Sequence, residues 1–121
     1  MKTKFAIVTL AGSLMVGAAA YAQGLTLPWD EMSPLTGEDR AMIKDTVQRQ
    51  IHDQRPNTVA KWANPASGHS GTITLLSKLV RQGMPCERIE YQIVEPGGQQ
   101  QHGHYIFTSC QLSDGTWKLA D

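Results

Sequence analysis

The chain has 121 residues and carries 11 Lys and Arg against 11 Asp and Glu, which gives a net charge of zero at pH 7. Nucleic-acid-binding domains need a basic face, so this balance argues against nucleic acid as a partner. The chain contains two cysteines, Cys86 and Cys110. They lack the Cys-x-x-Cys spacing that is typical of zinc sites, which argues against a structural zinc.

Residues 1–22 have the pattern of a secretory signal peptide. Lys2 and Lys4 precede an almost continuous apolar run, and Ala20 and Ala22 form the small-x-small pattern that signal peptidase accepts. The apolar run falls short of the roughly 20 residues that a membrane-spanning helix needs, although a retained membrane anchor is the alternative. We therefore predict a periplasmic or secreted protein with no membrane span after cleavage.

Cleavage at this site leaves 99 residues with a net charge of −2, enough for one small domain. No cysteine lies at the cleavage site, which disfavours a lipoprotein and leaves outer-membrane association open. Residues 23–35 contain Pro28, Trp29 and Pro34 and have no helical or strand period, so we predict an extended N-terminal arm. The domain is then expected over residues 36–121.

An amphipathic helix is predicted at the start of this domain. Thr36 is a suitable N-cap, and Asp39 stands where the partner residue of a capping box belongs. Apolar residues then recur at i, i+4 and i+8: Ile43, Val47 and Ile51. The pattern indicates about four turns ended by Pro56, packed on the domain's own sheet, with a partner-binding helix as the alternative.

Beyond Pro56 the apolar period changes to two. Five short β-branched or aromatic runs are separated by Asn-Pro, Gly, Pro and Asp-Gly punctuation: residues 58–62, 71–80, 86–94, 103–111 and 116–119. A helix followed by strands predicts an α+β fold, with the helix packed on a small antiparallel sheet of four to five strands. Asp114 and Gly115 mark a tight turn before the last strand.

The register of the longest hairpin follows from two independent constraints. With residues 95–101 as its loop, the alignment that places Cys86 opposite Cys110 also pairs two sets of apolar residues: Ile89 with Phe107, and Tyr91 with Tyr105. We therefore predict a Cys86–Cys110 disulfide on the wetter face of the hairpin, with a metal-binding or nucleophilic thiol as the alternative. The other residues of that face are polar and are expected to meet water or a partner: Arg88, Glu90, Gln92, His104 and Thr108.

Three ordered motifs carry a resemblance to a known family. The first reads W-x-N-P-x-S-G-x-x-G, the second is a cysteine, and the third reads C-x-x-x-D-G-x-W. Their residues in this chain are Trp62, Asn64, Pro65, Ser67, Gly68 and Gly71, then Cys86, then Cys110, Asp114, Gly115 and Trp117. The pattern resembles the C-terminal domain of the bacterial seventeen-kilodalton surface-antigen family. The resemblance implies an envelope protein with a helix on a small antiparallel sheet, although this chain lacks the lipobox cysteine and glycine zipper that family members commonly carry.

The first motif also has a plain physical interpretation as a turn. Asn64 and Pro65 start a turn, Ser67 can bond to nearby backbone, and Gly68 and Gly71 permit positive φ or a close approach of chains. A ligand-binding or glycan-binding loop is the alternative. The two tryptophans of the motifs, Trp62 and Trp117, are expected to pack in the core or on the sheet.

Candidate catalytic residues are few. His102 and His104 lie on one strand face and are candidates for a metal pair, with His69 as a third ligand if its loop folds over the hairpin. Ser67 and Ser70 stand in no G-x-S-x-G elbow, and the acidic residues show no pairing near an activating base. We therefore predict no enzymatic activity, no metal site and no cofactor.

Together these features predict an exported cell-envelope protein with a binding or structural role. Its expected partner is an envelope protein or a cell-wall component. A small-ligand or metal-binding periplasmic module is the first alternative, and an inhibitor of a secreted enzyme is the second.

The signal pattern generates a direct prediction. The exported protein should begin at Gln23, because Ala20 and Ala22 place the cleavage site after Ala22. Intact-mass measurement of the protein released from the producing cells would test this. Retention of residues 1–22 in a membrane fraction would contradict it.

Overall fold

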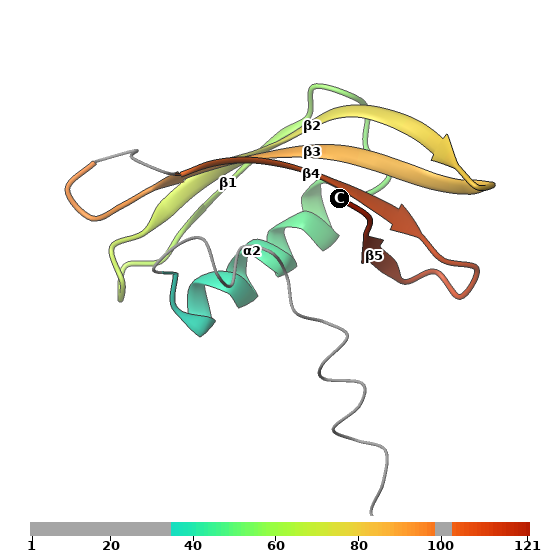
Figure 1. Cartoon of the computed structure of the whole chain (residues 1–121). Coiled ribbons are helices and arrows are strands. Elements are labelled where there is room, and N and C mark those ends of the chain that lie inside the picture. The colour runs from blue at the N-terminus through green and yellow to red at the C-terminus, as the bar shows by residue number, and fades with distance from the viewer. Residues whose placement is uncertain (1–34, 99–102) are drawn as a thin grey trace, which may run out of the picture.

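The computed structural model describes residues 35–98 and 103–121, which contain one helix and a five-stranded sheet. The helix is α2 (Gly37–Gln50), and the sheet is antiparallel with its strands in sequence order. The strands are β1 (Val59–Ala63), β2 (Ser70–Arg81), β3 (Met84–Val94), β4 (His104–Gln111) and β5 (Trp117–Leu119). The α+β prediction is confirmed at this level (Figure 1). The signal peptide and residues 23–34 of the expected arm lie outside the described residues.

Helix α2 begins with the predicted capping box. The Thr36 hydroxyl accepts a 3.0 Å hydrogen bond from the Asp39 backbone N–H, and the Asp39 carboxylate accepts a 2.9 Å bond from the Thr36 backbone N–H. The helix ends at Gln50, so the prediction that Pro56 terminates it was wrong. Asp53 has a φ of 66°, and this left-handed residue turns the chain out of the helix before proline is reached.

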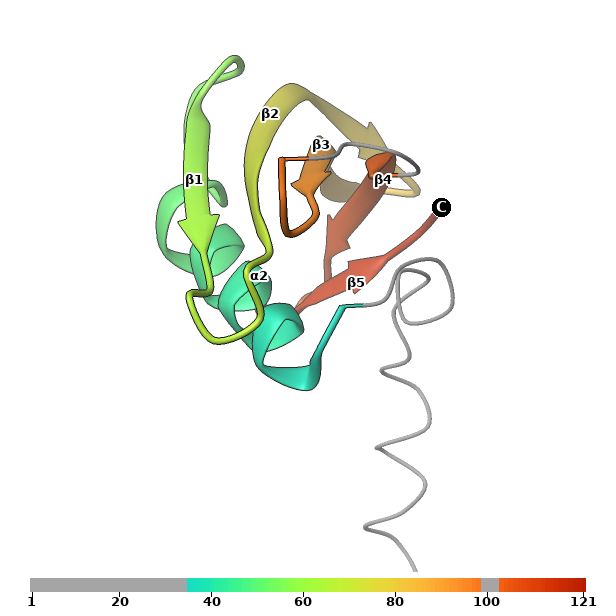
Figure 2. The same ribbon diagram turned by 90° about the vertical axis from the view of Figure 1, so that its left-hand side faces the viewer.

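The sheet curls over α2, which lies against one of its faces (Figures 1 and 2). The predicted helix stripe faces this inner side of the sheet, and the core forms between the two layers. The core contains Leu35, Ile43, Val47, Ile51, Ala60, Trp62, Ile73, Leu75, Ile89, Tyr91, Ile93 and Phe107. Leu35 is 6 % exposed, so packing already includes the last residue that the sequence assigned to the arm.

The predicted register of the β3–β4 hairpin is confirmed. Cys86 pairs with Cys110, Ile89 with Phe107, and Tyr91 with Tyr105. The β2–β3 hairpin is longer than expected, because β2 continues to Arg81 and β3 already starts at Met84. Gln82 and Gly83 form the two-residue turn with φ values of 50° and 77°, the positive values that a tight hairpin needs.

The two cysteines form the predicted disulfide, with a Cα–Cα distance of 4.0 Å. However, the expectation that the residues of this face meet water or a partner was wrong at the disulfide end. Cys86, Cys110 and Thr108 are 2 %, 3 % and 0 % exposed. The C-terminus runs beside β4. Arg81 at the end of β2 forms a 2.8 Å ion pair with Asp121, and β3 and β4 lie between these two elements in the sheet. This ion pair covers the disulfide end of the face.

Reducing the disulfide should lower the free energy of unfolding by about 3 kcal/mol, because the unfolded chain then regains the entropy of a loop of about 25 residues. Urea unfolding of oxidised and reduced protein gives the difference. Thiol labelling of the unfolded, unreduced protein is the control and should find no free thiol. Two labelled thiols in oxidised exported material would contradict the disulfide.

Candidate functional site

The loop between β1 and β2 holds the first sequence motif and is a compact turn. The Gly68 N–H donates to the Asn64 carbonyl at 2.9 Å, and the Ala66 N–H donates to the Asn64 side-chain oxygen at 3.1 Å. Pro65 lies inside this turn and is exposed. Gly68 has a φ of 81°, which a residue with a Cβ rarely adopts. The motif therefore shapes a turn that directs side chains towards the helix.

Those side chains meet the carboxylate of Asp39, which is fully buried. The side-chain amide of Asn64 and the hydroxyl of Ser67 each donate a 2.7 Å hydrogen bond to Asp39 Oδ1, and the Thr36 N–H donates to Oδ2. Burial alone would raise the pKa of the Asp39 carboxyl. The hydrogen bonds from Ser67, Thr36 and Asn64 outweigh this effect and hold the pKa below its ordinary value.

Asp39, Ser67 and His69 lie together without forming a catalytic triad. His69 Nδ1 is 2.9 Å from Asp39 Oδ2, near enough for an ion pair with a protonated ring, but its angle makes no hydrogen bond. The Ser67 hydroxyl donates directly to Asp39, whereas a triad needs it to donate to the imidazole. The cluster therefore holds the β1–β2 loop on the N-terminus of α2.

A second buried carboxylate lies at the other end of the helix. Glu87 on β3 is 2 % exposed, and its Oε1 is 2.6 Å from His52 Nδ1. Its other oxygen accepts a 3.0 Å hydrogen bond from the Asp53 N–H. The His52 ring stacks on Trp117 of β5, with ring centres 4.1 Å apart. Trp117, which the sequence placed in the core or on the sheet, is half-buried at the edge of the domain.

Sequence reasoning missed the burial of both carboxylates, since it found no pairing of the acidic residues near an activating base. Asp39 joins His69, which lies 30 positions along the chain, and Glu87 joins His52 across 35 positions. Neither spacing forms a motif. The available signal was local for Asp39, whose capping-box position already predicted a contact with the helix N-terminus.

The histidines named as metal candidates do not gather in the part of the chain that the structure describes. His104 Nε2 is 2.8 Å from Glu90 Oε2 on the neighbouring strand, and His69 faces Asp39. His102 lies outside the described residues. Within residues 35–98 and 103–121 no three His, Cys, Asp or Glu side chains are arranged to hold a metal ion.

The outer face of the sheet, opposite α2, carries a row of polar side chains across four strands. Lys61, Thr72, Gln92 and His104 are direct cross-strand partners on β1, β2, β3 and β4. The Thr72 hydroxyl donates to Gln92 Oε1 at 3.4 Å. We call this surface the polar outer face. It is the strongest candidate for an interaction surface, because its side chains remain accessible while the polar groups of the inner face are buried.

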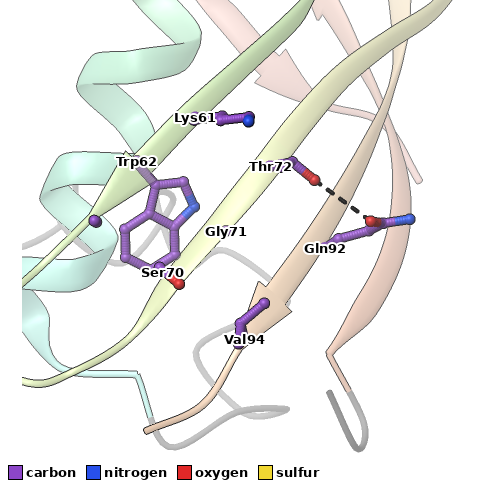
Figure 3. Close-up of a pocket in the computed structure, with 8 residues that line it drawn as sticks. Lys61, Trp62, Ser70, Gly71, Thr72, Gln92 and Val94 are labelled. Atoms are coloured by element: carbon purple, nitrogen blue, oxygen red, sulfur yellow. Dashed lines mark hydrogen bonds between the residues drawn. The ribbon is translucent and has the colours of Figure 1, made fainter. Parts of the chain in front are cut away.

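A hollow of about 470 Å³ lies on the polar outer face around β1, β2 and β3 (Figure 3). Gly71, which lies in the lining, leaves room for the indole of Trp62. A Cβ at Gly71 would lie 2.7 Å from Trp62 Nε1 and would clash with the Gln92 carbonyl. Of the two roles expected for Gly71, the structure shows the close approach of chains.

The last motif forms the β4–β5 turn. Gly115 has a φ of 90°, and the Asp114 carboxylate accepts hydrogen bonds from the Thr116 N–H and hydroxyl at 2.9 and 2.6 Å. This turn sets the position of Trp117, the first residue of β5, beside His52. The motif thus supports the helix end indirectly.

Comparison with protein-family models, curated proteins and solved structures gives no match for this chain. The resemblance to the surface-antigen family therefore stays a prediction. Of the residues that the structure describes, no helix is long and apolar enough to cross a membrane.

The Asp39 cluster makes a prediction about acid stability. Asp39→Asn should lower the free energy of unfolding at pH 7 by about 2–4 kcal/mol, because the amide cannot accept the buried hydrogen bonds in the same way. The folded pKa of Asp39 lies below the ordinary value of 3.8. Its stabilisation is therefore complete above that value and is lost as the pH falls from there through the lower folded pKa.

Urea unfolding at a series of pH values from about 6 to about 2 measures both effects. The matched control is Asp45→Asn on the exposed side of α2, where the Arg49 ion pair is solvated and a change within about 0.5 kcal/mol is expected. The same acid dependence in Asp39→Asn as in the parent protein would contradict the assignment.

Proposed function

We propose that this chain is an exported cell-envelope protein that works without catalysis, by binding or structural support through its polar outer face. The observation that carries the proposal is the row of Lys61, Thr72, Gln92 and His104 across four strands, on the side of the sheet that α2 leaves uncovered. A sheet with one packed face commonly directs polar residues to the other face.

The distribution of polar groups supports a role at this surface. Asp39 and Glu87 are buried and engaged in contacts that hold the helix ends. Two aliphatic side chains are also exposed on the polar outer face. Val59 is 55 % exposed and Ile106 is 38 % exposed. Polar groups with a few exposed aliphatic ones are typical of surfaces that bind another macromolecule.

The charges of this face favour an acidic partner. Lys61, Arg88 and Lys118 are exposed on it. Of the carboxylates on this face, Glu90 is half-buried and bonded to His104, and Asp121 is paired with Arg81. Complementary charges raise association rates and select partners. We infer that the partner is an envelope protein or a cell-wall component that presents acidic groups.

Export has separate support. A buried disulfide forms and persists in oxidising compartments, and residues 1–22 have the pattern of a secretory signal. The motif resemblance to the surface-antigen family agrees with an envelope location. We place the protein in the periplasm or outside the cell.

Site-specific photocrosslinking in intact producing cells tests the binding surface. A photoreactive phenylalanine analogue at Thr72 should yield a crosslinked species, whereas the same analogue at Asp45 on the far side of the molecule should not. Lys61→Glu should weaken the Thr72 crosslink, because it reverses a charge on the contact surface. Arg49→Glu on α2 is its matched control and should leave the crosslink unchanged.

Cosedimentation of the purified protein with isolated cell walls separates the two kinds of partner. Binding to walls that Lys61→Glu weakens identifies a wall component, whereas a protein-sized crosslink without wall binding identifies an envelope protein. Equal crosslinking at Thr72 and Asp45, with no wall binding, would refute the proposal.

A further inference from the structure

A second cavity, of about 380 Å³, lies on the helix side of the sheet, between α2 and β5. We call it the α2–β5 cavity. Its volume is within the range of sites that hold small molecules. It lies on the opposite side of the sheet from the polar outer face, so an inference about it does not depend on the proposed function.

The walls of the α2–β5 cavity are largely apolar and firmly held. Val47, Leu119 and the rings of Tyr91 and Trp117 line it. The indole of Trp117 lies parallel to the imidazole of His52, with an interplanar angle of 3°. The Glu87 carboxylate contacts Nδ1 of this imidazole at 2.6 Å and fixes the orientation of the ring. The stacked pair therefore forms a flat wall of fixed orientation.

The polar groups that line the cavity favour an anion. Lys44 is the one permanently charged side chain among the described residues that line it, and Lys44 forms no ion pair within the described part of the chain. No carboxylate belongs to the described lining.

Helix α2 places the cation and an apolar residue of the lining at different depths of the cavity. Lys44 and Val47 are three positions apart on α2, so they share one helix face. Lys44 is exposed, whereas Val47 is 7 % exposed. The cation therefore lies at the mouth of the cavity and the apolar wall lies inside it.

We propose that the α2–β5 cavity binds a small organic anion with a flat apolar body. The apolar body lies against Val47, Leu119 and Trp117, and the anionic group meets the ammonium of Lys44 at the mouth. His52 stacks on the indole of Trp117 and keeps this wall in place, because the Glu87 carboxylate contacts its Nδ1 atom.

Titration of the oxidised, isotope-labelled protein with 1-naphthoate, followed by NMR, tests this site. The neutral analogue 1-naphthamide has the same flat body and is the matched ligand control. Naphthoate should cause saturable shifts of the backbone amide signals of residues 44–52 and 109–119, with a Kd below about 1 mM. Naphthamide should bind about fivefold more weakly, because it lacks the charge that meets Lys44. Lys44→Gln should remove this difference, since Lys44 is exposed and its replacement leaves the core intact.

Arg49→Gln, which removes an exposed cation of α2 outside the cavity, is the matched protein control and should leave both Kd values unchanged. The proposal is overturned if naphthoate causes no saturable shift in these residues. It is also overturned if naphthoate and naphthamide bind equally well, or if Arg49→Gln weakens naphthoate binding as much as Lys44→Gln does.

Discussion

The buried carboxylate of Asp39 is the interaction on which the N-terminal half of the domain depends. It closes the capping box of α2, and it accepts hydrogen bonds from Asn64 and Ser67 of the β1–β2 loop. A carboxylate without these donors would be strongly unfavourable in a site with no solvent exposure. Its place in the first helical turn adds a favourable interaction with the positive end of the helix dipole. One side chain thus joins the helix start to the first hairpin.

The other end of α2 is held by a pair of different character. Glu87 lies near the helix C-terminus, where the helix dipole disfavours a negative charge. The contact with His52 Nδ1 and the hydrogen bond from the Asp53 N–H compensate for this, and the stacking of His52 on Trp117 brings in β5. Between the two polar ends, helix and sheet make apolar contacts, which are strong but not directional. The polar pairs at the two ends therefore specify where along the sheet the helix lies.

The polar groups that hold the fold together are different from those that are available at the surface. The buried acids and imidazoles that resemble catalytic groups are engaged in holding α2, and the Ser67 hydroxyl donates to a carboxylate instead of to a histidine. The two surfaces proposed for interaction lie on opposite sides of the sheet. One is the polar outer face with its cross-strand row, and the other is the α2–β5 cavity with an apolar wall and a cation at its mouth. Both present cations, although the chain has equal numbers of acidic and basic residues.

Local patterns in the sequence determined the capping box, the apolar stripe of α2, the alternation of the strands and the turn at Asp114 and Gly115. The register of β3 and β4 was also predictable, because the cysteines and the apolar pairs independently require the same alignment. The tertiary structure alone decided which loop reaches Asp39, which histidine meets Glu87, and that the C-terminus covers the disulfide end of the outer face. These contacts join residues 25 to 40 positions apart, and they follow from the curl of the sheet over the helix, which no periodicity in the chain encodes.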